Sequence, residues 1–274
     1  MGINIDTTMA FPNVQENNSI GAGIRVQSPK GPYKTNPLAP DSFRKPPVVL
    51  TPYNQMDRLY QKLLEKVAPN VLLDAYLSEN AVTKMIENNP NIMNILKKHN
   101  VPLTINLDNV KDIKKEHLYS TESFARGIAS EMNLSQAEKD TICRGALFHD
   151  FGKILIPAEL LNKKGKLTAE EKKIVDLHST LGYELLKTTN LSPEVLEIVK
   201  NHHKPLNKNP DLKTQIVSVA DIYSALRTER SYKQTLSQEQ SLNILRKYSE
   251  MGQVDPQIIE ALTEHVKIPD LTLV

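Results

Sequence analysis

The sequence predicts an all-α protein. Apolar residues recur at helical spacing along most of the chain, and no stretch alternates apolar and polar residues as a half-buried strand does. Helix-start signals punctuate this pattern, such as Ser135 followed by Glu138, and Ser192 followed by Pro193. We expect a small helical region over residues 49–106 and a larger bundle of about seven helices over residues 107–265.

The first 48 residues differ from the rest of the chain. Eight of the 17 prolines fall within the first 52 residues, among many Asn, Ser and Thr, and no helical or strand period persists there. Such a segment buries too little apolar surface to offset its chain entropy. We therefore predict a disordered tail over residues 1–48, and a short C-terminal tail over residues 266–274.

Helices are expected in order after this tail. The apolar spacing from Met56 to Val67 predicts the first helix, and three short ones follow over 70–79, 82–88 and 91–99. His99 then suits a cation at a helix C-terminus, and residues 103–107 form an extended linker. The small region fits a sensor or docking unit for a protein partner.

The larger region repeats clear start and stop signals. Asp108 begins a long helix that ends near Met132. Later helices are expected over residues 135–150, 168–187, from 192 to the pair at 202–203, and around the apolar run at 216–222. Pro157, Pro205 and Gly252 supply breaks, and His265 suits a second C-terminal cation.

Composition limits the classes of function. The net charge of +2 indicates neither a nucleic-acid nor a membrane-surface partner. No segment reaches the length of a membrane span, and the N-terminus carries no secretory signal, so a cytoplasmic protein is expected. The single cysteine, Cys143, excludes an internal disulfide and is expected to be a small core residue.

One set of polar residues points to chemistry. Five of the seven histidines and two aspartates lie in stretches predicted to be helical. They are His117, His149, Asp150, His178, His202, His203 and Asp221. Imidazole and carboxylate ligands together suit iron, manganese and zinc, and a helical bundle can bring them to one interior point. The set favours a metal-dependent hydrolase over the alternative of separate salt-bridged or surface residues.

Residues 117 to about 262 resemble the HD-GYP domain, a branch of the HD phosphohydrolase superfamily that degrades cyclic di-GMP in bacterial signalling. The resemblance is carried by several motifs with characteristic spacing. They are His149-Asp150-Phe151-Gly152-Lys153-Ile154-Leu155-Ile156-Pro157, then Leu160–Thr168, His178 four residues before Gly182, Val219–Leu226, and Arg230-Ser231-Tyr232-Lys233.

The resemblance implies a site and a reaction. The seven ligands named above would hold two metal ions, iron or manganese, with Asp150 bridging them. A hydroxide generated there would attack phosphorus and open the cyclic dinucleotide to a linear product. Asp150 and Lys153 would be catalytic, and Lys153, Arg230 and Lys233 would bind the substrate phosphates.

Two departures from the family pattern bear on substrate and metal number. The Gly-Tyr-Pro loop that should follow His203 is shortened to the stretch 204–210 and lacks these residues, and Gln215 stands in place of an arginine. Ile113 occupies the position of a carboxylate that holds a third metal in some members, so two metals at most are expected. An HD phosphohydrolase acting on another nucleotide, and an inactive HD signalling or binding module, remain alternatives.

Overall fold

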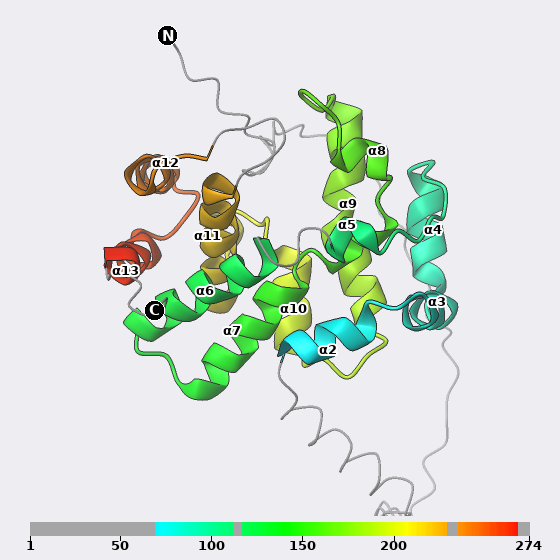
Figure 1. Ribbon diagram of the computed structural model, residues 1–274, viewed down its shortest axis with the longest axis horizontal. Coiled ribbons are helices and arrows are strands. Elements are labelled where there is room, and N and C mark those ends of the chain that lie inside the picture. The colour runs from blue at the N-terminus through cyan, green and yellow to red at the C-terminus, as the bar shows by residue number, and fades with distance from the viewer. Residues whose placement is uncertain (1–68, 112–116, 229–234, 268–274) are drawn as a thin grey trace, which may run out of the picture. The chain divides into compact units, whose positions relative to one another are not determined.

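The computed structural model describes residues 69–111, 117–228 and 235–267. All of these residues belong to one compact unit, and every regular element among them is a helix (Figure 1). The all-α prediction is confirmed. Seven helices of nine residues or more follow residue 107 in the described part of the chain, in agreement with the predicted bundle.

Three short helices open the described chain, with bounds within three residues of those predicted. They are α2 (Pro69–Tyr76), α3 (Glu79–Glu87) and α4 (Pro90–Lys98). The Ser78 hydroxyl accepts a hydrogen bond from Ala81 N and caps α3. The Asn89 side chain accepts one from Asn91 N and caps α4. His99 is the C-cap residue of α4, in the position expected for a helix-end cation.

Two helices follow the irregular residues of the predicted linker. The expected long helix is described as α5 (Asp108–Lys111) and α6 (Tyr119–Glu131), with Met132 as its C-cap. Residues 112–116, and with them Ile113, lie outside the described residues. α7 (Gln136–Phe148) begins at the predicted capping box, in which Ser135 Oγ accepts from Glu138 N and the Glu138 carboxylate accepts from Ser135 N.

The chain turns sharply after α7. A break was expected at Pro157, but the 3₁₀ helix that precedes it, η3 (Phe151–Leu155), was not predicted. η3 lies directly against α9 (Ala169–Leu186), and α8 (Ala158–Leu161) connects the two. A Cβ at Gly152 would overlap His178 O and Gly182 N, so only glycine permits this approach of the two backbones.

The next helices also begin where the sequence predicts. Thr168 Oγ1 accepts from Glu171 N at the start of α9, and Ser192 Oγ accepts from Val195 N at the start of α10 (Pro193–Asn201). A short turn, η4 (Leu206–Lys208), leads into α11 (Leu212–Arg227), which is almost completely buried. α11 therefore forms the central helix of the bundle and packs against α6, α7 and α10.

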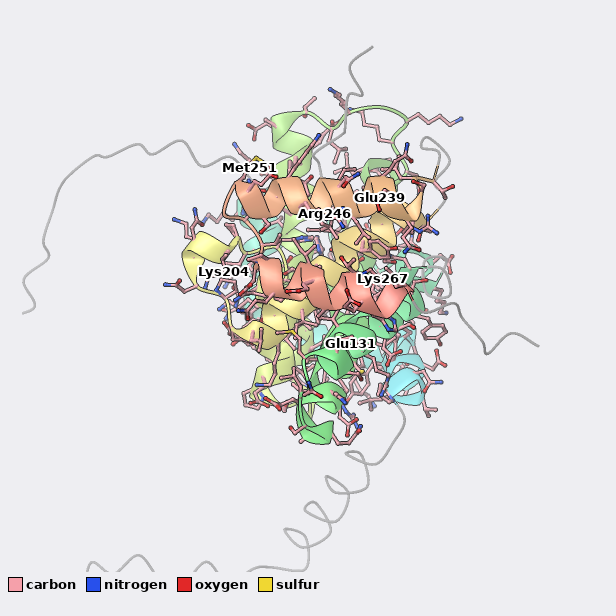
Figure 2. The ribbon with its side chains drawn as sticks, turned by 90° about the vertical axis from the view of Figure 1, so that its left-hand side faces the viewer. Glu131, Lys204, Glu239, Arg246, Met251 and Lys267 are labelled. Atoms are coloured by element: carbon pink, nitrogen blue, oxygen red, sulfur yellow. The ribbon has the colours of Figure 1, made fainter. Side chains whose placement is uncertain are left out.

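The C-terminal pair, α12 (Gln238–Glu250) and α13 (Pro256–Lys267), completes the bundle. Figure 2 shows the two helices side by side, with Glu131 at the end of α6 beyond α13. His265 lies in the last turn of α13, where its ring fills the space left by the missing side chain of Gly127. Cys143 is fully buried, which confirms its assignment to the core, and burial raises the pKa of its thiol far above the usual range.

The three N-terminal helices pack onto the bundle. α2 contacts α7, while α3 and α4 contact α9 (Figure 1). Asn89 is buried and its Nδ2 donates to both Glu184 O and Glu184 Oε2 at 2.7 Å. The Lys187 ammonium also pairs with the Glu184 carboxylate. The predicted boundary at residues 106–107 remains a prediction, but residues 69–98 share an extensive interface with the larger bundle.

Some predictions concern residues outside the described part. These are the tail over 1–48, the helix from Met56 to Val67, and most of the C-terminal tail. Among the described helices, none combines the length and the apolar character needed to cross a bilayer.

Candidate metal centre

The predicted ligands come from helix ends and helix interiors that meet at one point. His149 and Asp150 follow the last residue of α7, and His202 is the C-cap of α10 with His203 next to it. The other three ligands come from the chain entering α6, from α9 and from α11. They are His117, His178 and Asp221. Six of the seven are buried and His203 is half-buried, so the structure brings the whole predicted set together.

One group of ligands consists of His117, His149 and Asp221. Their ligand atoms all lie within 4.8 Å of one another. Asp221 Oδ1 lies 3.1 Å from His117 Nε2 and 3.6 Å from His149 Nε2. These three atoms are fully buried and have no hydrogen-bond partner. Buried polar atoms are rarely left unpaired, and their convergence is the expected property of a site for a cation.

A second group consists of His178, His202 and His203. Each of the Nε2 atoms of His202 and His203 lies 3.2 Å from His178 Nε2. Three imidazoles with converging nitrogens repel one another when they are protonated. Burial, with the neighbouring histidines next in importance, lowers the pKa of His202 well below its usual value and that of His203 to about 3. Both rings are therefore neutral at pH 7, which is the form that binds metals.

Asp150 connects the two groups. Its Oδ2 lies 3.2 Å from His149 Nε2, and its Oδ1 lies 3.3 Å from His178 Nε2. Burial alone would raise the pKa of this carboxyl, but His149 and Lys153 outweigh burial and hold the pKa well below the usual range. An ionised carboxylate with one oxygen toward each group has the geometry of a bridging ligand.

The tautomers of the histidines are fixed by the other ring nitrogen. The Nδ1 atoms of His149, His178 and His202 each donate to the backbone carbonyl three residues earlier, at 2.7, 2.7 and 2.9 Å. Since a carbonyl only accepts, the proton of each neutral ring resides on Nδ1. Burial alone would lower the pKa of His149, but Asp150 and Asp221 raise it to about 10, so a metal that binds there displaces a second proton from Nε2. The Nε2 lone pair of each ring is then available to a metal, in the arrangement common to metal-binding histidines.

Two serines of α11 support the site, and the sequence did not identify them as functional. Ser224 Oγ lies 3.0 Å from His117 Nδ1 and donates to His117 O, so it accepts the imidazole proton. Ser218 Oγ donates to His202 O at the end of α10. Together with Asp221 they form a polar stripe, at three-residue spacing, in the mainly apolar stretch of α11 from Ile216 to Leu226. This polar stripe is the sequence feature that could have identified the two serines as part of the site.

The donor set fits divalent metal ions. Five imidazoles and two carboxylates converge in two groups that share one carboxylate, and the orphaned nitrogens and oxygen of the first group need a cationic partner. The ionised form of Asp221 adds to this fit. Burial would raise its pKa, but the imidazoles of His117 and His149, whose Nε2 atoms lie 3.1 and 3.6 Å from its Oδ1, hold the pKa well below the usual range.

The remaining predicted site residues have mixed outcomes. Lys153 lies at the site: it is 9 % exposed and its Nζ donates to Asp150 Oδ2 at 2.6 Å. Arg230 and Lys233 lie outside the described residues, so their role in phosphate binding stays a prediction. Gln215, which stands where the family has arginine, donates to Pro210 O and so contacts the shortened loop.

Part of this chain is similar in sequence to known proteins. Residues 115–226 match the family model of the HD domain. A 3'3'-cGAMP-specific phosphodiesterase 1 from Vibrio cholerae is 28 % identical over 171 residues, which cover 57 % of this chain and 40 % of the relative. The cyclic di-GMP phosphodiesterase response regulator RpfG from Xanthomonas campestris is 34 % identical over 148 residues, which cover 49 % and 39 %.

A solved structure supports the fold. The HDG"Y"P protein Bd1817 from Bdellovibrio bacteriovorus superposes with a TM-score of 0.50 at 14 % identity, over 73 % of this chain and 68 % of that one. The match to the two curated relatives spans about two fifths of their length. The motifs, the seven clustered residues and these similarities lead to one conclusion: residues 115–226 of this chain are similar to the HD domain, and proteins named as cyclic dinucleotide phosphodiesterases are among the relatives that they match.

Proposed function

We propose that this protein is a two-metal phosphodiesterase that hydrolyses a cyclic dinucleotide, cyclic di-GMP first among them, to a linear product. The observation that carries the proposal is the pair of ligand groups joined by Asp150, built from all seven predicted ligands. The similarity to relatives named as cyclic di-GMP and 3'3'-cGAMP phosphodiesterases supports the substrate class.

Each part of the site has a defined role in this proposal. Two divalent ions, iron or manganese, supply Lewis acidity and activate water at neutral pH. Asp150 links the two half-sites, the group that contains His149 and the group that contains His178, because each of its oxygens faces one of these histidines. The Lys153 ammonium, fixed beside Asp150 at the edge of the centre, donates to a substrate phosphate oxygen and balances its charge.

The substrate within this class depends on features outside the ligand set. The stretch 204–210 is too short for the Gly-Tyr-Pro loop, and Arg230 and Lys233 belong to the proposed phosphate contacts. Relatives with different cyclic dinucleotide substrates occur among the matches. We therefore include cyclic di-GMP and 3'3'-cGAMP in the same assay. An HD phosphohydrolase for another nucleotide is the alternative if both resist cleavage.

The test uses full-length protein purified without oxygen and loaded with iron or manganese. We expect conversion of a cyclic dinucleotide to its linear form, and a loss of about a thousandfold or more in kcat for Asp150→Ala, because this side chain serves both half-sites. Asp140→Ala is the matched control: the same substitution at an exposed position on α7. Its activity should equal that of the wild type.

Metal content decides between the alternatives. About two ions per chain with no turnover of either dinucleotide would refute the proposed substrate class and leave a metal centre for another phosphate ester. No bound metal in the wild type, under conditions that load other two-metal enzymes, would instead support an inactive binding module.

A further inference from the structure

The turn η3, which carries Lys153, is held from two sides. On one side Gly152 lies against the backbone of α9 at His178 and Gly182, at a distance that only a glycine allows. On the other side lies α5, whose Val110 is fully buried. The position of η3 therefore depends both on α9, which carries the ligand His178, and on α5, which contributes none of the seven ligands.

Among the described residues, the side-chain hydrogen bonds from α5 to this turn are made by Asn109. Asn109 Nδ2 donates to Lys153 O and to Ile156 O, both at 2.8 Å. A side-chain amide has two N–H donors, and here both are used on the same turn. Just before it, Asn106 N donates to Ile154 O at 2.8 Å, a backbone contact that does not depend on the side chain. Asn106 and Asn109 together donate hydrogen bonds to three backbone carbonyls between Lys153 and Ile156.

Lys153 is consequently fixed at three of its own atoms. Its backbone N donates to Asp150 O at 3.0 Å, its carbonyl accepts from Asn109, and its Nζ donates to Asp150 Oδ2 at 2.6 Å. A lysine side chain loses much rotamer entropy on ordering. Because the backbone of Lys153 is already fixed, less conformational entropy is lost when its ammonium is held beside Asp150.

We propose that Asn109 is a positioning residue: through the two carbonyls it binds, it fixes η3 and thereby holds the Lys153 ammonium at the metal centre. The inference rests on the proposed function, in which Lys153 contacts a substrate phosphate. Asn109 itself touches none of the seven metal ligands in the hydrogen bonds of the described residues. Its removal should therefore leave metal binding intact and impair the chemical step.

The central variant is Asn109→Asp, which keeps the shape of the side chain but replaces two donors with an acceptor facing two carbonyls. Asn109→Ala removes the same donors without a charge, and is measured alongside so that a folding defect of the aspartate does not decide the outcome. Asn243→Asp is the matched control, because Asn243 is exposed on α12 and the same charge is added there.

The first readout is a kinetic double-mutant cycle with Lys153→Met. Displacement of Lys153 should lower kcat by about 10- to 100-fold, with KM little changed and about two metals still bound. In the Lys153→Met background the same Asn109 substitution should cost almost nothing further, because the residue it positions is gone. Fully additive losses would show a general structural role and overturn the proposal.

The second readout needs no turnover. The rate at which an acylating reagent labels Lys153, measured by mass spectrometry on metal-loaded protein, should rise several-fold in both Asn109 variants and stay unchanged in Asn243→Asp. Labelling that does not change in either Asn109 variant would overturn the proposal. If the wild type cleaves no cyclic dinucleotide, the proposed function fails, while the labelling of Lys153 still decides whether Asn109 positions it.

Discussion

At the scale of single residues, the metal centre depends on the hydrogen-bond acceptors of the histidine Nδ1 atoms, which orient the rings. Three ligand histidines take their partner from their own helix, but His117 takes it from Ser224, which lies 107 residues later in the chain. No pattern local to either residue indicates this pair. The residues that gather at the site could be predicted from sequence, whereas the partners of Ser218, Ser224 and Asn109 could not, because these side chains bind segments far away in the chain.

Ser224→Ala should weaken the half-site that contains His117. Without the acceptor for its Nδ1 proton, this imidazole is free to change tautomer and orientation, and loss of such a supporting contact typically costs 10- to 100-fold in metal affinity. Titration with a competing chelator measures the effect. Ser241→Ala removes an equally buried hydroxyl from α12 and should leave the metal affinity unchanged. Equal losses in both variants would contradict the assigned role of Ser224.

At the scale of elements, helix starts were predicted well because their caps are local. Three helices begin at a side chain that accepts a hydrogen bond from the backbone N–H three residues ahead, namely Ser135, Thr168 and Ser192. Such a cap depends on only four consecutive residues, so it can be recognised in the sequence. The form of η3 was not predicted. It depends on the contact between Gly152 and the backbone of α9, whose residues follow only after α8.

Gly152→Ala should displace η3, whose N-cap residue is Asp150, the ligand shared by the two groups. A methyl group there overlaps His178 O and Gly182 N, so η3 and α9 must separate, and with them Asp150 and His178. We expect a loss of more than half of the bound metal, measured by elemental analysis, and a destabilisation of about 1–3 kcal/mol. Gly165→Ala is the comparison.

Gly165 has a φ of 109° but open space around its Cα, so alanine there strains the backbone without touching the site. It should lose about 1 kcal/mol of stability and keep its full metal content. Retention of both metals by Gly152→Ala would refute the importance of the close approach.

At the scale of the whole molecule, the described helices form one unit in which α2–α4 cover α7 and α9. Sequence reasoning separated a small region from the larger bundle, since apolar spacing shows that a helix has a buried face but not which core it joins. The buried hydrogen bonds from Asn89 to Glu184 cross this predicted boundary. Their two residues lie 95 positions apart.

Metal removal should lower the thermal stability of the protein. Ions that bind the folded chain alone stabilise it by about 2.7 kcal/mol for each site at a hundredfold excess over Kd. For a protein of this size, chelation of two ions should lower the melting temperature by about 10 °C or more. Differential scanning fluorimetry with and without chelator measures it. Asp150→Ala should show little shift, and an equal shift in that variant would contradict two-site binding.

The placement of the Nδ1 acceptors has a consequence for protein engineering. His149, His178 and His202 each carry the group that orients them within the preceding turn of their own helix. Each of these histidines therefore needs only four residues of its own chain: the carbonyl three residues earlier binds Nδ1 and orients the ring, which leaves the Nε2 lone pair for a metal. A designer who grafts this centre onto another helical scaffold needs to copy backbone placement for these three, and must build a new hydroxyl partner for His117 alone among the four.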